Sequence, residues 1–456
     1  MTKSFLFGWL AVASLRSAGP AVNPEMFAPA NMTEVKLNGL TVRLGKPVEV
    51  ASVLGWEVGW RPAEHYIAGA TRDPSAHFSR AGTHLVPFLA RFPRGNLIAT
   101  YALDPDTQEN PVYVNGFQFS QDGGAHWGKR YTVIMQHQEL VYIPKPPDSL
   151  LGVASELTER TPGDNRNLIG PAYLFEHGGE RMVFLPDGIK LVDWPWPVEV
   201  VETKQQPRTN WHAGIHITGN AFELGGRLLA TVYGEKKDDW MPGTKKLVRR
   251  SMLATSEDGG YTWRYLSEIA HSDLAHATER SYEGPDETSC IPLADGDLMA
   301  VFRVGSGRKW NLDRAYSHDG GKTWTQPDTL PAWSVWPQLL RTADGTIALA
   351  TGRPGIGLWL STDGRGRNWQ QIDVVAYHNR WAPDPTYRID SFPVSTNDPY
   401  LTEPVKWQTT SYNAIVQLAP NKLLLLYDRS TERVPKDSND LSRVFVLPIE
   451  IERGAD

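Results

Sequence analysis

The sequence predicts an all-β fold, and more closely a six-bladed β-propeller built from four-stranded antiparallel blades. Composition is the first reason, because 40 Gly, 34 Pro and 17 Trp among 456 residues indicate frequent tight turns and many large flat side chains. The second reason is a series of apolar hairpins along the chain, and the third is a short turn motif that recurs between them. Repeated hairpins of this kind are typical of propellers.

Each expected blade contains a hairpin in which two apolar runs flank a turn. The turns fall roughly 50 to 85 residues apart, close to the length of a four-stranded blade with varied outer loops. Some of these strands are continuously apolar, as expected when neighbouring blades cover both faces of a sheet. The hairpins occupy residues 87–101, 172–185, 220–233, 289–303, 337–353 and 413–428.

The two ends of the chain are expected to meet. The apolar run 444–451 should pair with the first strands after Met32, at 35–37 and 40–42, which closes the ring and removes an open sheet edge. We therefore expect one domain over residues 30–452. The segment 374–407, rich in Trp, Tyr, Pro and Asp, is predicted to be a loop that roofs the pocket.

Composition and charge exclude several classes of protein. With 41% hydrophobic and 21% charged residues, the chain can bury a large core and is not expected to be disordered or a coiled coil. The formal net charge of -6 is spread over the whole length without a block of like charges, so we expect no nucleic-acid partner. The single cysteine, Cys290, cannot form an internal disulfide.

The N-terminus has the layout of a signal peptide. Lys3 precedes the apolar run 5–15, and small residues follow through Ala21. The apolar run of about 11 residues is too short to span a bilayer, which needs roughly 20, and no later stretch reaches that length. We expect a leader over residues 1–22, a secreted or periplasmic protein and no membrane span. An N-terminal strand is the alternative interpretation.

The recurring turn motif has a clear physical purpose. It places a Ser and an Asp at a strand end, then glycines that accept positive φ, then a Trp that can cover the turn. An Asp in this position can accept backbone N–H bonds across the turn, so the motif predicts a hairpin staple. Its copies lie at 120–127, 256–263, 317–324 and, with one inserted residue, 361–369.

This Ser-x-Asp-x-Gly-x-Thr-Trp element resembles the Asp box, or BNR repeat, of sialidases (neuraminidases) and related six-bladed β-propellers. The resemblance extends over nearly the whole chain. In that family the boxes sit on outer turns away from the active site, so no catalytic role is expected for them. The resemblance implies a glycan substrate and a glycosidase activity, and we expect neither a cofactor nor a metal. The sequence indicates no oligomeric state.

The resemblance also implies a set of site residues on the inner hairpins. Glu287 and Arg303 resemble the family's Glu-then-Arg pair on one hairpin, and Arg353 stands where the family has another substrate-binding arginine. Tyr412 is similar to the family's nucleophilic tyrosine. A neutral phenol suits an anomeric carbon that bears a carboxylate, and Glu287 would act as its base. This assignment requires the Glu287 and Tyr412 side chains to lie within hydrogen-bond reach of each other.

The general acid is expected in the segment that follows the first inner hairpin. The family has an Asp on this loop, and the segment contains Asp104, Asp106 and Glu109. Asp104 and Asp106 are the matching residue type, and we favour Asp106.

One departure from the family concerns the substrate. Leu85 stands where the family's first arginine is expected, so the arginine triad for the sialic acid carboxylate is incomplete. His84, beside it, and His216, just before the third hairpin, are candidate substrate contacts. His212 and His216 share one face of a strand about 13 Å apart, which is too far for one metal ion.

The sequence therefore predicts an exo-glycosidase that releases a terminal sugar, sialic acid or a related acidic sugar, with retention and a Tyr nucleophile. Two alternatives remain. A non-catalytic glycan-binding propeller would keep an aromatic pocket and one arginine but would need neither nucleophile nor acid. A polysaccharide lyase acting on a uronate-containing glycan would use a Tyr or His to abstract a proton.

Overall fold

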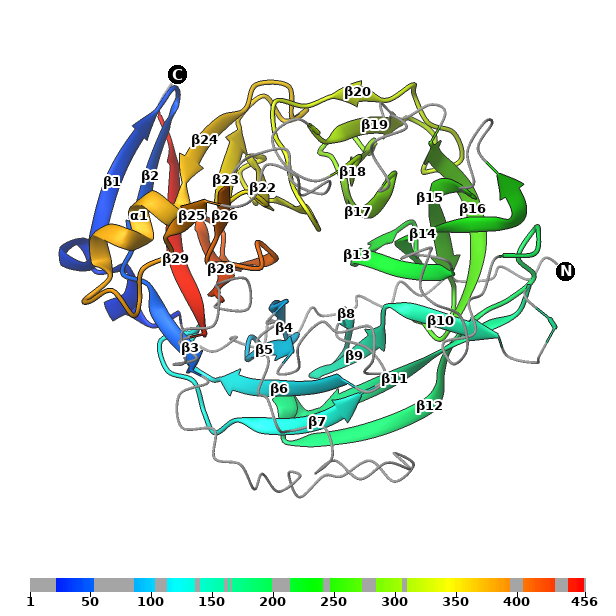
Figure 1. The fold of residues 1–456 in the computed structure, drawn as a ribbon, viewed down its shortest axis with the longest axis horizontal. Helices are drawn as coiled ribbons and strands as arrows, with labels where there is room; N and C mark the ends of the chain where they lie inside the picture. Colours follow the sequence, from blue (N-terminus) through cyan, green and yellow to red (C-terminus); the bar gives the residue numbers. More distant parts are fainter. Residues whose placement is uncertain are drawn as a thin grey trace, which may run out of the picture.

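The structure is a computed structural model that describes residues 22–52, 86–102, 113–135, 140–159, 163–164, 166–198, 214–240, 247–272, 284–305, 310–393, 405–430 and 442–454. These residues form antiparallel sheets arranged around a ring (Figure 1). The all-β prediction is confirmed, since α1 (Val374–Trp381) is the one α-helix in these ranges. Short 3-10 turns are η1 (Pro24–Phe27), η2 (Pro29–Asn31) and η4 (His177–Gly179).

Several sheets follow the expected pattern, in which successive strands pair with their neighbours in chain order. One contains β4 (Phe88–Arg91), β5 (Leu97–Ala102), β6 (Tyr113–Ser120) and β7 (Tyr131–Met135). Another contains β17 (Asp286–Pro292), β18 (Leu298–Arg303), β19 (Asp313–Ser317) and β20 (Asp328–Thr329). A third contains β21 (Gln338–Arg341), β22 (Ile347–Gly352), β23 (Ile356–Ser361) and β24 (Gln370–Asp373).

The strands from β8 to β16 do not form separate blades. They form one continuous sheet of order β10-β13-β14-β15-β16-β12-β11-β9-β8. The outer strands β12 and β16 join in parallel through Leu191 and Trp263, while β10 pairs with both β11 and β13. The strands are β8 (Leu140–Lys145), β9 (Ser149–Ala154), β10 (Glu156–Glu159), β11 (Leu168–Glu176), β12 (Arg181–Leu191), β13 (Ile215–Leu224), β14 (Arg227–Trp240), β15 (Leu247–Ser256) and β16 (Thr262–His271).

The predicted closure between the chain ends is confirmed. Strand β29 (Arg443–Arg453) pairs with β2 (Leu40–Gly45) on one side and with β28 (Lys422–Arg429) on the other. Strand β1 (Met32–Leu37) continues this sheet beyond β2, β27 (Asn413–Ala419) continues it beyond β28, and β3 (Val48–Ser52) also pairs with β29. The first and last strands of the described chain thus share one sheet.

The innermost strand of each part of the ring contacts the next. Strands β4, β8, β13, β17, β21 and β27 touch in this order, and β27 touches β4 (Figure 1). One predicted inner hairpin is wrong, because 172–185 falls on β11 and β12, whereas β8 and β9 line the ring there. Pro146-Pro147-Asp148 forms the β8–β9 turn, which lacks the glycine found in the turns of β4–β5, β17–β18 and β21–β22.

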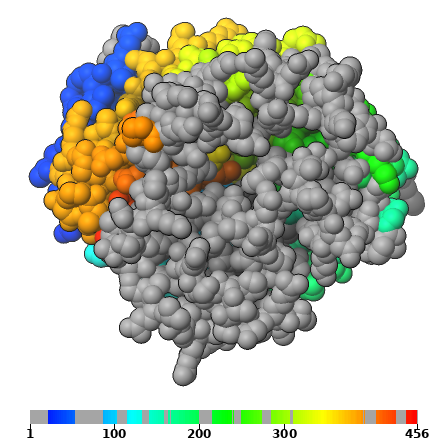
Figure 2. All heavy atoms as spheres, in the orientation of Figure 1, coloured from blue at the N-terminus to red at the C-terminus, as the bar shows by residue number. Residues whose placement is uncertain are grey.

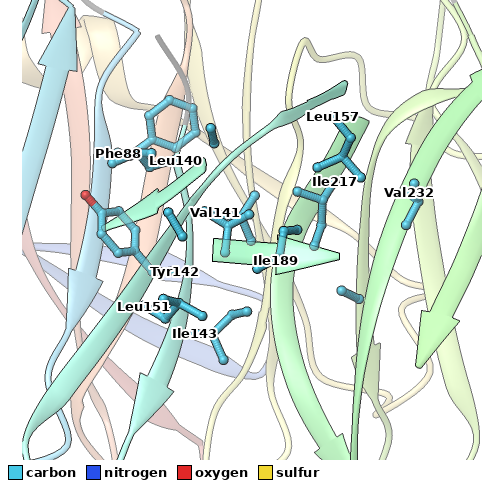
Figure 3. Packing of buried hydrophobic residues seen from close by; sticks show 14 of the residues in the cluster. Phe88, Leu140, Val141, Tyr142, Ile143, Leu151, Leu157, Ile189, Ile217 and Val232 are labelled. Carbon is cyan, nitrogen blue, oxygen red and sulfur yellow. The ribbon is translucent and has the colours of Figure 1, made fainter. Parts of the chain in front are cut away.

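Apolar side chains fill the space between adjacent parts of the ring. Figure 3 shows one such core, in which Val141 and Ile143 of β8 lie among side chains from the strands on either side. Ile217 of β13 and Val232 of β14 belong to the same buried cluster. This packing holds the inner strands in fixed positions relative to one another.

The recurring turn motif forms the predicted staple. In the copy between β15 and β16, the Asp258 carboxylate accepts backbone N–H bonds from Tyr261 and Thr262, and Trp263 donates its indole N–H to the Gly260 carbonyl. These bonds lower the pKa of Asp258 against the raising effect of burial. The other copies connect β6 to β7, β19 to β20 and β23 to β24, so all lie on turns between outer strands.

The segment 374–407 is not wholly a loop, which corrects the expectation. Its described part contains α1, capped by Asp373, and the hairpin of β25 (Ser391–Pro393) and β26 (Val405–Trp407). The Tyr377 hydroxyl donates to the Leu44 carbonyl and His378 contacts the Tyr427 hydroxyl, so α1 packs against the closing sheet. The first strands, in blue, accordingly lie beside yellow and orange residues in Figure 2.

Candidate active site

The site is built on the first hairpin of the β17–β20 sheet. Asp286 of β17 is paired with Arg303 of β18, and Glu287 follows at the start of the innermost strand. The backbone at Gly284 lies so close to the backbone of Arg303 that a Cβ on Gly284 would lie 2.4 Å from the Arg303 carbonyl oxygen. Only glycine fits at this position. Gly284 also has φ +95°, a conformation that side chains other than hydrogen rarely allow.

Glu287 holds the described part of the site together. Its Oε2 accepts a hydrogen bond from Nη1 of Arg303 and another from the backbone N–H of Trp336, both at 2.8 Å. Its Oε1 accepts a hydrogen bond from the Tyr412 hydroxyl at 3.2 Å. Glu287 is only 5% exposed and Tyr412 only 8%. The required distance between the Glu287 and Tyr412 side chains is therefore met.

The Arg353 side chain lies near the ring of Tyr412. It directly follows β22, and its guanidinium carbon is 5.6 Å from the centre of the Tyr412 ring. Its Nη2 donates to the Thr410 carbonyl at 3.3 Å. Gly352 permits this arrangement, because a Cβ there would lie 2.0 Å from the Ser411 carbonyl oxygen. Arg303, Glu287, Tyr412 and Arg353 are thus brought together as the sequence predicts.

Unusual backbone conformations concentrate at this site. Positive φ values occur at Glu287 (41°), Trp336 (43°), Arg353 (59°) and Ser411 (67°), and Val86 (29°) precedes the neighbouring strand β4. A positive φ in a residue other than glycine costs of order 1–3 kcal/mol and persists only where the surroundings impose it. Strain of this kind is characteristic of sites where side chains must point in a set direction.

The geometry allows specific chemistry. A carboxylate that accepts the hydrogen bond of a phenol can take its proton when the phenolic oxygen attacks an electrophile. Arg303 balances the charge of that carboxylate and fixes one of its oxygens. Trp336 is 2% exposed and packs against Phe88 and Tyr412.

A second buried charge cluster lies next to Glu287, and it was not among the predicted site residues. The guanidinium of Arg249 on β15 contacts Glu235 of β14 at 2.9 Å and Asp286 of β17 at 2.8 Å. Burial raises the pKa of Glu235 to about 7, and Arg249 opposes that shift. One signal was present, since Glu235 follows an apolar strand much as Arg303 and Arg353 do.

His216 belongs beside this second cluster. Its ring stacks on Tyr233 with a centroid distance of 4.7 Å, and the Tyr233 ring lies 5.7 Å from the guanidinium carbon of Arg249. Its Nδ1 lies 3.5 Å from the Ser155 hydroxyl. The structure thus puts His216 on the sheet that precedes Glu287.

The remaining candidates lie outside the described residues. These are His84, Leu85, Asp104, Asp106 and Glu109. Within the described ranges, no group of three or more His, Cys, Asp or Glu side chains could hold a metal ion. No helix in the same ranges is long and apolar enough to cross a membrane.

The chain is similar to several solved structures. A protein of unknown function from Dyadobacter fermentans is 17% identical, with a TM-score of 0.55 over 82% of this chain and 96% of that one. An α-L-arabinofuranosidase of Fusarium graminearum is 14% identical over 88% and 97% of the two chains, with a TM-score of 0.49. A Hadza microbial sialidase is 12% identical over 81% and 65%, also at 0.49.

A search of the curated proteins finds no match. The family model of the BNR repeat-like domain matches residues 189–426, which include three copies of the turn motif as well as Glu287, Arg303, Arg353 and Tyr412. The match extends over more than half of the chain, and the chain therefore belongs to the BNR repeat-like domain family.

Proposed function

We propose that this protein is a retaining exo-glycosidase, a six-bladed propeller of four-stranded blades that releases a terminal sugar from glycans. One observation carries the proposal: the buried Tyr412 hydroxyl donates to the Glu287 carboxylate at 3.2 Å, with Arg303 bonded to the carboxylate and Arg353 near the tyrosine ring. A phenol with an ordinary pKa near 10 needs such a partner to act as a nucleophile at neutral pH. A protein that only binds glycans needs no such pair.

The proposed reaction has two steps. In the first, the Tyr412 oxygen attacks the anomeric carbon, its proton passes to Glu287, and the bond to the leaving oxygen breaks as an acid protonates that oxygen. In the second, water attacks the same carbon, the tyrosine oxygen leaves and recovers its proton from Glu287, and the water proton returns to the acid. Asp104 and Asp106 are the proposed acids.

A covalent glycosyl-tyrosine is the feature that tests this function. We expect Tyr412→Phe to lower kcat at least about 100-fold while KM changes only a few-fold, since only the covalent step needs the hydroxyl. A panel of aryl glycosides supplies the assay, and a 2-fluoro or 3-fluoro glycosyl fluoride should add one sugar mass to the Tyr412 peptide of the unmodified protein.

Tyr427→Phe is the matched control, because Tyr427 is also buried in the closing sheet and hydrogen-bonded, but to His378. It should keep kcat. An unchanged kcat in Tyr412→Phe would contradict the assignment of the nucleophile. Products that absorb in the ultraviolet, in place of reducing sugars, would instead support a lyase.

The proposed substrate is a terminal sugar other than an ordinary α-sialoside. Leu85 replaces one arginine of the family's triad, and Arg303 is already bonded to Glu287. Each lost charge-assisted bond costs roughly 1.5–3 kcal/mol, or about ten- to a hundredfold in recognition. A glycoside panel with sialosides, uronides, deoxy sugars and neutral sugars should show poor sialoside cleavage, improved by Leu85→Arg. Efficient cleavage of sialosides by the unmodified protein would refute this preference.

We also propose that residues 1–22 direct export, since the apolar run follows a basic start. A secreted enzyme would meet glycans outside the cell. Mass spectrometry of the protein recovered from its native host should find the N-terminus after residue 20.

A further inference from the structure

We propose that the buried cluster of Glu235, Arg249 and Asp286 is a positioning device for Glu287. The inference rests on the proposed hydrolase function, in which Glu287 must present Oε1 to the Tyr412 hydroxyl. In this role, the sheet that contains β13, β14 and β15 holds the first residues of β17 in place.

Arg249 fixes Asp286, the residue before Glu287. Nη1 of Arg249 donates to Oδ2 of Asp286 at 2.8 Å, while its Nε and Nη2 both contact Oε1 of Glu235 at 2.9 Å. All three side chains are buried, with 9% or less of each exposed. Bonds of this charged kind are short and directional, so they fix the place of Asp286 relative to β14 and β15.

Hydrogen bonds from the preceding sheet fix Thr288, the residue after Glu287. The Thr288 hydroxyl lies 2.6 Å from the Ser251 hydroxyl of β15. The Thr288 carbonyl accepts hydrogen bonds from the hydroxyls of Thr218, on β13, and Thr231, on β14. Glu287 therefore stands between two residues that are both bonded to the preceding sheet.

The backbone of Glu287 needs such support. Its φ of 41° is unfavourable for a residue with a Cβ, and the β17–β18 register shifts between Asp286 and Ser289. A strained residue keeps its conformation only when neighbouring contacts outweigh the strain. The bonds at Asp286 and Thr288 supply those contacts on either side. They hold Glu287 in the bent conformation that directs its carboxylate toward Tyr412.

Electrostatics agree with this role. Two carboxylates share one guanidinium, and burial raises the pKa of Glu235 to about 7, so Glu235 is largely protonated below that pH. The groups that face it are Arg249 from β15 and Asp286 from β17. With Glu235 neutral, the full charge of Arg249 is directed at Asp286, which strengthens the bond next to Glu287.

The chain supplies a matched control in the next residue. Arg250 also bridges two carboxylates, Asp239 and Glu268, and its side chain is 11% exposed, close to the 9% of Arg249. Because successive residues of a strand point to opposite faces, Arg250 does not reach β17. Either substitution removes two ionic bonds, but only Arg249 is bonded next to Glu287. The partners of Arg249 are 4% and 1% exposed and those of Arg250 are 27% and 24% exposed, so Arg249→Gln should cost more stability.

The test compares Arg249→Gln with Arg250→Gln in the full chain. We expect Arg249→Gln to lower kcat about 10- to 100-fold with KM within about threefold, because a small misplacement of a reacting group has that effect. Arg250→Gln should keep kcat within about twofold. Thermal unfolding of both variants checks that each is folded at the temperature of the assay. Equal losses of kcat in the two variants would overturn the proposal.

Asp286→Asn is the second variant, in case Arg249→Gln does not fold. It removes one charge while keeping the shape of the side chain, and a fall in kcat without a change in KM is expected again. Glu235→Gln should lower kcat only a few-fold. If Glu235→Gln instead abolished cleavage of poor leaving groups and spared activated aryl glycosides, Glu235 would itself be the proton donor, and the positioning role would be refuted.

Crystal structures of the variants separate this inference from the proposed function. In Arg249→Gln, the distance between Glu287 Oε1 and the Tyr412 hydroxyl should exceed about 3.5 Å, the limit of a hydrogen bond, and in Arg250→Gln it should not. An unchanged distance in Arg249→Gln would overturn the positioning role even if the unmodified protein were an active glycosidase. Absence of any glycosidase activity would overturn the function and leave this geometric test valid.

Discussion

Glu287 and Glu235 are both buried carboxylates, but they differ in the groups that surround them. Glu287 accepts bonds from Arg303, the Trp336 amide and Tyr412, so its negative charge has several donors. Glu235 shares Arg249 with a second acid, Asp286. Burial therefore raises the pKa of Glu235 to about 7, despite the guanidinium beside it. Glu235 is thus a carboxylate suited to carry a proton, whereas Glu287 is surrounded by hydrogen-bond donors.

The raised pKa of Glu235 predicts a pH dependence of stability. In the unfolded chain Glu235 ionises near pH 4.5, but in the folded protein only near 7, so the folded state holds the extra proton between these values. The stabilisation is complete below pH 4.5 and is lost as the pH rises through 7. Relative to Glu235→Gln, which stays neutral, the free energy of unfolding of the unmodified protein should fall by about 3 kcal/mol over this range.

Urea denaturation of the two proteins at pH 5 and pH 8 measures this difference. Asp193→Asn is a suitable control, because Asp193 is exposed and its change should leave the pH dependence as it is. A constant difference between the unmodified protein and Glu235→Gln at both pH values would show that Glu235 ionises in the folded state as it does in the unfolded chain.

At the scale of elements, most hairpins were predictable, whereas their grouping into sheets was predictable only in part. The apolar runs around Gly95, Gly296 and Gly345 identify β4–β5, β17–β18 and β21–β22, because glycine at a turn is a local signal. The hairpin β8–β9 was missed because its turn is Pro146-Pro147-Asp148. The parallel junction of β12 with β16 depends on segments distant in the sequence, which no local pattern reports.

The same distinction separates the predicted site residues from those that were missed. Glu287, Arg303, Arg353 and Tyr412 each stand in a recognisable local motif, so the resemblance could place them on inner hairpins. The Glu235–Arg249–Asp286 cluster joins three strands from two sheets, and each of its members is an ordinary charged residue in its own segment. Helix α1 was missed because the Trp, Tyr, Pro and Asp content of segment 374–407 suggested a loop, whereas tertiary packing against the closing sheet decides its structure.

At the scale of the whole molecule, the ring depends on the pairing of its two ends. Strand β2 contributes Leu40, Val42 and Leu44 to the core, and their partners on β29 include Ile449 and Ile451. Closure leaves the long strand β29 with a neighbour on each side, so its backbone groups are not exposed as an edge. The Tyr377 bond to the Leu44 carbonyl ties α1 to the same junction.

Removing the first strands should therefore destabilise the entire ring. Burying each of Leu40, Val42 and Leu44 contributes about 1.5–3 kcal/mol, so a chain that begins at residue 46 should lose about 5–9 kcal/mol, much of the stability of an ordinary domain. The exposed edge of β29 should also promote association. We expect a large fall in Tm by differential scanning fluorimetry and higher oligomers by size-exclusion chromatography. A chain that begins at residue 22 is the control and should keep both the Tm and the elution volume of the full chain. If the two truncated chains unfolded at the same temperature, the pairing of β2 with β29 would not be what closes the ring.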